Sequence, residues 1–183
     1  TAAAVESVTS ELVQMGIIPL IIGGGQDLTV SLYKALEILG QPAQVVTLDA
    51  RLDFGADPEQ VTSLNFMNEV ILHEPNFLFD YTNLGHQGYL TDPDTLELLE
   101  KMQFEALRLG TVQGNIEEME PILRDADLVS IDCGVIRAAD HPAHAHAGPN
   151  GLSAASACQL ARYAGMSDRL KVLGIFENNR SLD

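Results

Sequence analysis

The stretch Val45-Val46-Thr47-Leu48-Asp49-Ala50-Arg51-Leu52-Asp53 decides how the rest of this chain is interpreted. It begins with β-branched and aliphatic residues, typical of a buried strand, and ends with an acid two positions to either side of an arginine. In an extended backbone, residues 49, 51 and 53 point to the same side. Burying three such charges is costly unless they neutralise one another or bind a metal ion. The end of this strand is therefore the first place to look for chemistry.

Outward from this stretch, helical and strand patterns alternate along the chain. Helices are predicted over residues 2–15, 27–39, 63–73, 93–102, 115–125 and 153–164. Strands are predicted over residues 17–22, 45–49, 77–84, 104–109, 128–132 and 170–176. Such alternation forms right-handed βαβ units. The expected fold class is α/β, a three-layer αβα sandwich with a mainly parallel sheet, in a single domain spanning residues 1–183.

Local signals sharpen some of these elements. The continuous apolar run over residues 17–22 predicts a strand that is buried on both faces. Asp27 is placed to cap the following helix, and Asp92-Pro93 is expected to open another. Pro121 is expected to kink or restart the helix over residues 115–125, because proline cannot donate an interior hydrogen bond. Residues 53–60 and 133–150 are predicted to be loops.

Composition excludes several classes of protein. The chain is 46% hydrophobic but only 5% aromatic and has no tryptophan, so an aliphatic core is expected. A formal net charge of −16 argues against binding to nucleic acid or to anionic membrane surfaces. We find no apolar run long enough to span a membrane and no signal peptide. Cys133 and Cys158 form no CxxC motif, which favours a reducing, cytoplasmic location. Because the chain starts at Thr1 within a predicted helix, a fragment of a longer protein is expected.

Acidic residues follow several of the predicted strands directly. In a parallel sheet, ligands bind beyond the carboxyl ends of the strands. Asp49, Asp132 and Glu177 lie at such ends. A single acid there usually caps the next helix, but no helix begins near Asp49 or Asp132, so a shared site is favoured. The glycines at 23–25 lack both the dinucleotide spacing and the lysine of a phosphate-binding loop, so nucleotide binding is not favoured.

Five short motifs, in order, carry a resemblance to a known family. They are Gly-Gly after the first strand, Asp-Ala-x-x-Asp at 49–53, Ser-x-Asp at 130–132, Pro-Asn-Gly-Leu at 149–152 and Glu-Asn-Asn at 177–179. Together they span nearly the whole chain. In these motifs the chain resembles the ureohydrolases, which include arginase, agmatinase and formiminoglutamase. In overall texture it is most similar to the formiminoglutamase branch.

This resemblance implies an arginase-like sandwich that holds two Mn(II) ions. In the family, the ions bridge a hydroxide that attacks an amidine or guanidine carbon, and so hydrolyse C–N bonds in linear amidines. By the same resemblance, Asp49, Asp53 and Asp132 match metal ligands, and Glu177 matches a substrate-binding glutamate. Asp132 and Glu177 are therefore the candidate catalytic residues. A small-molecule substrate and assembly into a homo-oligomer are also implied.

The chain departs from the family pattern at several metal ligands. The first metal histidine falls on Gln26, and the histidine of Asp-Ala-His-x-Asp falls on Arg51. The second aspartate of Ser-x-Asp-x-Asp falls on Gly134, and the later Asp-Pro falls on Arg137-Ala138. No histidine lies between Leu52 and Leu72, where arginases carry a catalytic one. The metal-ligand set is therefore predicted to be degraded.

The two arginines suggest what replaces the metal. A guanidinium cannot give up its proton and so cannot ligate a metal. Arg51, placed among the three aspartates, would supply the positive charge that manganese otherwise provides, and Arg137 would add to it. Our hypothesis is an internal ion-pair network in place of the dinuclear centre. The alternative is that both arginines point to solvent and that metal binding is merely weak.

The loop after the Asp132 strand could supply other metal ligands. Asp140, His141, His144 and His146 gather there, over the expected site. Proline, alanine and glycine in the same loop predict flexibility, so adventitious metal binding is favoured over a native site. His73 and His86 are lone residues, interpreted as structural polar groups. Cys133 beside Asp132 is not favoured as a nucleophile, since negative charge raises a thiol pKa.

The sequence therefore predicts an inactive or altered member of the family that keeps its pocket. Arg51, Arg137 and Gln26 are the candidate ligand-binding residues, and a carboxylate such as a glutamate derivative is the expected ligand. One alternative is a weakly active one-metal amidine hydrolase that uses Asp49, Asp53 and Asp132. Another is a non-catalytic structural subunit.

Overall fold

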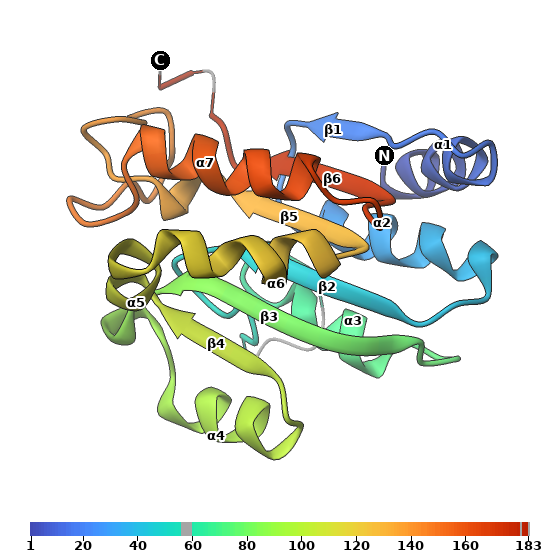
Figure 1. Ribbon diagram of the computed structural model, residues 1–183, viewed down its shortest axis with the longest axis horizontal. Helices are drawn as coiled ribbons and strands as arrows, with labels where there is room; N and C mark the ends of the chain where they lie inside the picture. The colour runs from blue at the N-terminus through green and yellow to red at the C-terminus, as the bar shows by residue number, and fades with distance from the viewer. Residues whose placement is uncertain (56–59, 180, 183) are drawn as a thin grey trace.

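The computed structural model describes residues 1–55, 60–179 and 181–182, and its centre is one six-stranded parallel sheet (Figure 1). The strands are β1 (Leu20–Ile22), β2 (Ala43–Leu48), β3 (Leu78–His86), β4 (Glu105–Arg108), β5 (Leu128–Asp132) and β6 (Val172–Phe176). Their order across the sheet is β1-β6-β5-β2-β3-β4. All neighbouring strands pair in parallel, which confirms the predicted α/β class.

Helices cover both faces of this sheet. The α-helices are α1 (Ala2–Gln14), α2 (Leu28–Leu36), α3 (Phe66–Leu72), α4 (Pro93–Lys101), α5 (Leu109–Gly114), α6 (Met119–Asp125) and α7 (Ala154–Gly165). Short 3₁₀ turns lie at η1 (Glu37–Leu39), η2 (Gly88–Leu90), η3 (Ile116–Glu118) and η4 (Cys133–Val135). In the part of the chain that is described, no helix combines the length and the apolar character needed to cross a bilayer.

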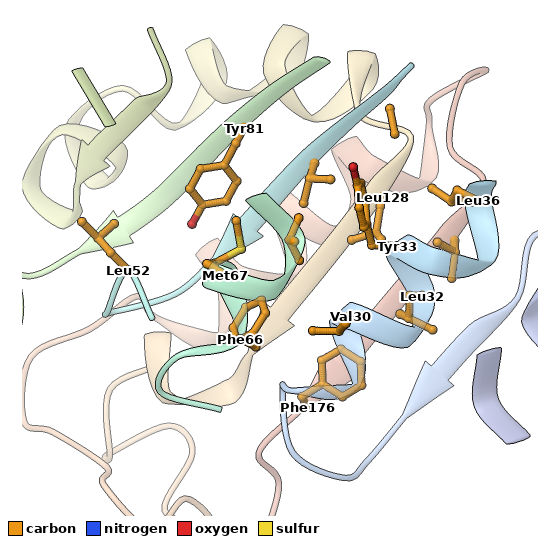
Figure 2. Packing of buried hydrophobic residues seen from close by; sticks show 14 of the residues in the cluster. Val30, Leu32, Tyr33, Leu36, Leu52, Phe66, Met67, Tyr81, Leu128 and Phe176 are labelled. Atoms are coloured by element: carbon orange, nitrogen blue, oxygen red, sulfur yellow. The ribbon is translucent and has the colours of Figure 1, made fainter. Parts of the chain in front are cut away.

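The two faces of the sheet pack different cores. On one face, α1, α2 and α3 surround the aromatic side chains Tyr33, Phe66, Tyr81 and Phe176 (Figure 2). On the other face, α5, α6 and α7 pack leucine, valine, isoleucine, alanine and one methionine, Met119, against the sheet. The expectation of an aliphatic core thus holds for the second face only. The few aromatic residues of this chain are concentrated on the first.

Strand β2 lies at the centre of the sheet and leads to the site. It pairs with β5 on one side and β3 on the other, with Leu48 beside both Ile131 and Leu84. Five of its six residues are buried. Because β2 and β5 end side by side, the residues that follow Leu48 meet the end of β5. The central position predicted for this stretch is confirmed.

Some local predictions are wrong. β1 is a short edge strand paired only with β6, and its Leu20 and Ile22 side chains are 57% and 70% exposed, so this strand is not buried on both faces. Asp27 precedes α2 but makes no side-chain capping hydrogen bond, since its backbone is already helical. The break expected at Pro121 comes earlier, because η3 ends and α6 begins before this proline.

Other local predictions are confirmed. Asp92 caps α4 by accepting a hydrogen bond from the backbone N–H of Asp94, with Pro93 at the first helical position. The helix predicted from residue 153 begins at Ala154, with Ser153 as its cap accepting from the N–H of Ser156. The loop predicted over residues 133–150 is confirmed from residue 136 on, whereas its first three residues form the 3₁₀ turn η4. The loop predicted over residues 53–60 lies partly outside the described residues.

Candidate functional site

The carboxyl ends of the central strands bring the predicted acids to one edge of the sheet. Asp49 follows β2, Asp132 ends β5 and Glu177 follows β6. A cavity of about 180 Å³ opens at this edge. It is lined by Asp49, Ala50, Arg51, Gln87, Tyr89, Leu90, Asp132, Gly134, His144, His146, Gly148, Pro149 and Asn150. This is where ligands bind in sheets of this kind.

The backbone turns sharply after β2. The Asp49 carboxylate accepts a hydrogen bond from the backbone N–H of Arg51 at 2.8 Å, and the N–H of Gln87 donates to the carbonyl of Ala50 at 2.9 Å. Asp53 adopts a left-handed conformation with φ 54°. Residues 49–53 are therefore not extended, and the expectation that their three side chains line one face is wrong. The turn instead folds Asp53 back toward Asp49.

Asp49 and Asp53 form a buried pair of carboxyl groups. Their side chains are 2% and 6% exposed and lie within hydrogen-bonding contact of each other. Burial raises the pKa of Asp49 well above its ordinary value, and the charges of Asp53 and Asp132 raise it further. Burial also raises the pKa of Asp53 to about 7. Burial and the mutual repulsion of the two groups therefore both disfavour their ionisation together.

Asp132 is hydrogen-bonded to a residue from the following loop. Its Oδ1 accepts hydrogen bonds from the N–H of Gly134 at 2.6 Å and from Nε2 of His144 at 3.2 Å. The N–H of His146 donates to Nδ1 of His144 at 3.0 Å. Nδ1 is thus an acceptor, so the ring proton lies on Nε2 and faces Asp132. The hydrogen bond to Asp132 raises the pKa of His144.

The arginine-centred ion-pair network is wrong. Among the described residues, no carboxylate lies within 4.0 Å of the Arg51 guanidinium, although its charge lowers the pKa of Asp53 against the larger effect of burial. Arg137 pairs with Asp140 at 3.0 Å and does not line the cavity. The turn at residues 49–51 is the reason, since it directs the acids inward and leaves Arg51 on the cavity wall.

Gln26 and Glu177 lie together behind the acids. The N–H of Gln26 donates to Oε1 of Glu177 at 2.9 Å, and its side-chain amide donates to Ser130 at 3.3 Å. Gln26 is fully buried, and among the described residues its Oε1 has no hydrogen-bond partner. Glu177 has φ 63°, a conformation that is uncommon outside glycine. Both predicted residues therefore lie in the site region, but neither of them lines the cavity.

A buried polar layer beneath the site was not predicted. Thr47 on β2 accepts a hydrogen bond from the Asn83 side chain at 3.1 Å and bonds to the Tyr81 hydroxyl at 3.0 Å. Asn83 also donates to the carbonyl of Arg51 at 2.8 Å, and so supports the turn. Ser130 bonds to Thr29 at 2.7 Å. The available signal was polar residues in the middle of otherwise apolar strands, which are costly unless hydrogen-bonded.

A second missed group holds the loop over the cavity. The Tyr89 hydroxyl donates to Oε1 of Gln87 at 2.6 Å. The same Oε1 accepts from the Asn150 side chain at 3.3 Å, and the Gln87 amide donates to the Asn150 carbonyl at 3.2 Å. Gln87 is 5% exposed. The Pro149-Asn150-Gly151 motif marked one partner of this clamp, but nothing in the sequence indicated the other.

Comparison with known proteins identifies the family. A sequence profile described as the arginase family matches residues 1–183. This chain belongs to the arginase family. No curated protein matches it. The family assignment agrees with the predicted resemblance to the ureohydrolases. The six-stranded parallel sheet with helices on both faces agrees with the predicted arginase-like fold.

Solved structures with this arginase-family fold include formiminoglutamases. That of Trypanosoma cruzi, solved with Mn²⁺, superposes with a TM-score of 0.91 and 19% identity over 100% of this chain and 64% of that one. The Bacillus subtilis formimidoylglutamase gives 0.84 and 18% over 100% and 60%. A quadruple mutant of a Trypanosoma brucei arginase-like protein gives 0.76 and 18% over 100% and 57%. The likeness is one of fold, and this chain spans less than two thirds of each structure.

The donor set does not fit a pair of manganese ions in this arrangement. Within residues 1–55, 60–179 and 181–182, no group of three or more His, Cys, Asp or Glu side chains is placed to hold a metal. Burial disfavours the charged forms of Asp49 and Asp53, and Asp132 is hydrogen-bonded to His144. Arg51, with no lone pair to donate, lies where the family resemblance expects a metal histidine.

Proposed function

We propose that this arginase-family protein binds a small carboxylate, such as a glutamate derivative, and that its manganese hydrolase chemistry is lost or altered. The observation that carries the proposal is the position of Arg51. Its guanidinium lines the cavity, and among the described residues it makes no ion pair within 4.0 Å. A guanidinium without a partner pairs well with a carboxylate, through two parallel hydrogen bonds.

The surrounding charges support an anionic ligand. The acids that would repel it are buried or hydrogen-bonded: burial raises the pKa of Asp49 and of Asp53, and Asp132 accepts a hydrogen bond from His144. Gln87 and Asn150 offer polar groups on the same cavity wall. Arg137 contributes less than predicted, since it pairs with Asp140 outside the cavity. We therefore assign carboxylate recognition to Arg51.

Ligand pairs that differ only in the α-carboxylate test this proposal. Arginine and agmatine form one such pair, and glutamate with 4-aminobutyrate, which keeps only the other carboxylate, forms another. In at least one pair, we expect the member with the α-carboxylate to bind more tightly in isothermal titration calorimetry. Arg51→Gln should weaken that binding about 10- to 100-fold, because a charge-assisted hydrogen bond is worth about 1.5–3 kcal/mol.

Arg137→Gln is the matched control, since Arg137 is also an arginine predicted to bind ligand but lies outside the cavity. It should leave the affinity unchanged. Equal loss in both variants would mean that net charge, not the cavity, attracts the ligand. Failure of every carboxylate to bind would contradict the proposal and favour a structural role.

A second candidate is a weakly active one-metal amidine hydrolase. It is favoured by Oδ2 of Asp49, a buried acceptor without a hydrogen-bond partner next to two further acids. The T. brucei mutant described above changes an arginine to histidine, with serine-to-aspartate changes two positions to either side. Arg51 has the same spacing from Asp49 and Asp53 here, so Arg51→His would provide the imidazole that a metal requires.

The hydrolase is tested separately from carboxylate binding. Elemental analysis of protein made without a histidine tag measures its metal content. Release of formamide or ammonia from formimidoylglutamate, with and without added Mn²⁺, measures activity. Near-stoichiometric metal together with Mn²⁺-dependent release would establish the hydrolase. If Mn²⁺-dependent release is absent in the wild type and appears in Arg51→His, Arg51 suppresses the hydrolase activity.

A further inference from the structure

We propose that the His144 imidazole blocks the Asp132 carboxylate by hydrogen bonding to it. The imidazole lies in space that a side chain at position 134 would otherwise fill. As long as it is seated, a cation cannot reach Asp132. This inference goes beyond carboxylate binding at Arg51, because it concerns the access of a cation to Asp132. It also identifies one residue of this chain that accounts for the poor fit to manganese.

The contact between His144 and Asp132 is enclosed and directional. Nε2 of His144 lies 3.2 Å from Oδ1 of Asp132, and the two side chains are 8% and 13% exposed. Nδ1 accepts from the N–H of His146 at 3.0 Å, which leaves the proton on Nε2. Both ring nitrogens are therefore engaged, one as acceptor and one as donor. A histidine in this state has no lone pair to give to a metal, so here it acts as a hydrogen-bond donor and not as a ligand.

Gly134 makes room for this imidazole. A Cβ atom at position 134 would lie 2.8 Å from both Cε1 and Nε2 of His144 and 3.0 Å from Oδ1 of Asp132. Real Cβ atoms essentially never come within such distances of other heavy atoms, so a side chain at 134 and the seated imidazole exclude each other. The family resemblance places an aspartate at this position. Glycine in place of that aspartate thus leaves the space in which the His144 imidazole lies.

The loop that carries His144 is fastened on both sides of it. Before His144, Asp140 accepts from the N–H of Ala154 at 2.8 Å, and the Ala143 carbonyl accepts from the N–H of Asn179 at 2.7 Å. After it, Asn150 is clamped by Gln87. The imidazole is therefore delivered by a segment with defined anchors. Removing His144 from Asp132 needs only a side-chain rotation, whereas moving the loop needs these bonds to break.

Binding of Mn²⁺ alone tests whether His144 excludes a cation. We compare tag-free wild type, His144→Ala and His141→Ala by titration calorimetry and by the electron paramagnetic resonance signal of free Mn²⁺. Affinity for Mn²⁺ should rise at least about tenfold in His144→Ala, as expected when a competing contact worth about 1.4 kcal/mol is removed. His141→Ala, which removes a histidine of the same loop that does not line the cavity, should match the wild type. Affinity that stays equal or falls in His144→Ala overturns the proposal.

Chemical modification tests the role of Gly134 without any metal. Diethyl pyrocarbonate acylates accessible, unprotonated imidazoles, and mass spectrometry resolves each site. In the wild type we expect His144 to react at least about tenfold more slowly than His146, because it is buried and its Nδ1 is engaged. Gly134→Ala should bring the two rates together by displacing the imidazole, with little loss in Tm because only a side-chain end must move. Equal acylation rates of His144 and His146 in the wild type would refute the proposed position of the His144 imidazole. A His144 that stays protected in Gly134→Ala would refute it as well.

Discussion

At the scale of single residues, the site limits the cost of its buried acids locally. Burial raises the pKa of Asp49 and of Asp53, and Asp132 takes hydrogen bonds from Gly134 and His144. Arg51 is the only cationic side chain in residues 45–53, and it lies on the cavity wall. The reason is geometric, because the turn after β2 is built from the Asp49 carboxylate and the Arg51 N–H, which separates the two side chains.

Gly85, near the end of β3, lies too close to its neighbours to accept a side chain. It has φ +115°, and an added Cβ would lie 2.7 Å from Cγ2 of Val135 and 3.4 Å from the carbonyl oxygen of Asp49. Gly85→Ala should lower the free energy of unfolding by about 2 kcal/mol or more, from overpacking together with backbone strain. Urea denaturation measures it. Gly88→Ala, where a Cβ would meet nothing within 4 Å, should cost less than about 1 kcal/mol. Equal costs at both positions would show that the close approach at Gly85 is not restrictive.

His86 makes stability depend on pH. It is 2% exposed, and within the described residues its ring nitrogens have no well-formed hydrogen bond, only a weak one with the backbone of Leu107. Burial, with a further contribution from Arg108, lowers the pKa of His86 below its ordinary value of 6.5. The unfolded chain therefore binds this proton more readily than the folded protein, so stability is present above pH 6.5 and is lost as pH falls below it.

His86→Phe removes this titration while keeping a ring in place. Between about pH 7.5 and about pH 5.5, the wild type should lose more free energy of unfolding than the variant does. Urea denaturation at each pH gives the comparison. His146→Gln serves as the control, because its exposed ring is hydrated whether or not the protein is folded. A wild-type slope no steeper than that of His86→Phe would rule out the assignment.

At the scale of elements, position in the sheet decides what each strand does. β2, at the centre, is buried and delivers the site, whereas β1, at the edge, exposes Leu20 and Ile22. Both strands are apolar in sequence, so their patterns alone predicted burial for both. What separates them is the number of neighbours, which depends on the order in which distant strands pair. The position of the β5–α7 loop likewise depends on a residue from another strand, because Gln87, which follows β3, hydrogen-bonds to Asn150 of this loop.

The Gln87 clamp should control the motion of that loop. Gln87→Ala removes the hydrogen bonds to Tyr89 and Asn150, so backbone amides of residues 144–150 should exchange with deuterium faster, by about fivefold or more for a loss of about 1 kcal/mol in local stability. Gln159→Ala, which removes only a bond to Tyr163 within α7, is the control and should leave the loop unchanged. Loop exchange that is equal in both variants would count against the clamp.

The exposed face of β1 should tolerate charge, unlike its inner face. Ile22→Lys replaces a 70% exposed side chain and should change the free energy of unfolding by less than about 0.5 kcal/mol, while reducing self-association measured by light scattering. Ile21 packs against the aromatic core, so Ile21→Lys should destabilise by about 2 kcal/mol or more. Similar costs for both substitutions would show that β1 is placed differently.

At the scale of the whole molecule, excess negative charge is the dominant global property. The chain carries 26 acidic and 10 basic side chains, a net charge of −16. Such an excess destabilises the compact state by self-repulsion and disfavours nucleic acid as a partner. Residence in the cytoplasm and assembly into a homo-oligomer stay predictions. Sedimentation measurements would determine the oligomeric state.

Salt should therefore stabilise this protein. Raising NaCl from about 20 mM to about 200 mM shortens the screening length from about 20 Å to about 7 Å, so repulsion between surface carboxylates weakens and Tm should rise by a few degrees. Differential scanning calorimetry measures it. KCl at the same concentration should act equally, whereas glucose at matched osmolality should not reproduce the effect. A Tm that falls or stays constant in salt would show that attractive ion pairs outweigh the repulsion.

The amino-acid sequence determined the α/β class, the order of the main helices and strands, and the acids at their ends. These features are local, since periodicity and capping residues act within a few positions of the chain. Only the tertiary structure decided that Asp49 faces Asp53, that His144 returns to Asp132, and that Arg51 lies on the wall of the cavity without an ion pair to any described residue. Those outcomes depend on the turn after β2, on the space left by Gly134, and on a loop anchored from other strands. Irregular turns and loop contacts of this kind leave no periodic signal in the sequence, and so only the folded arrangement reveals them.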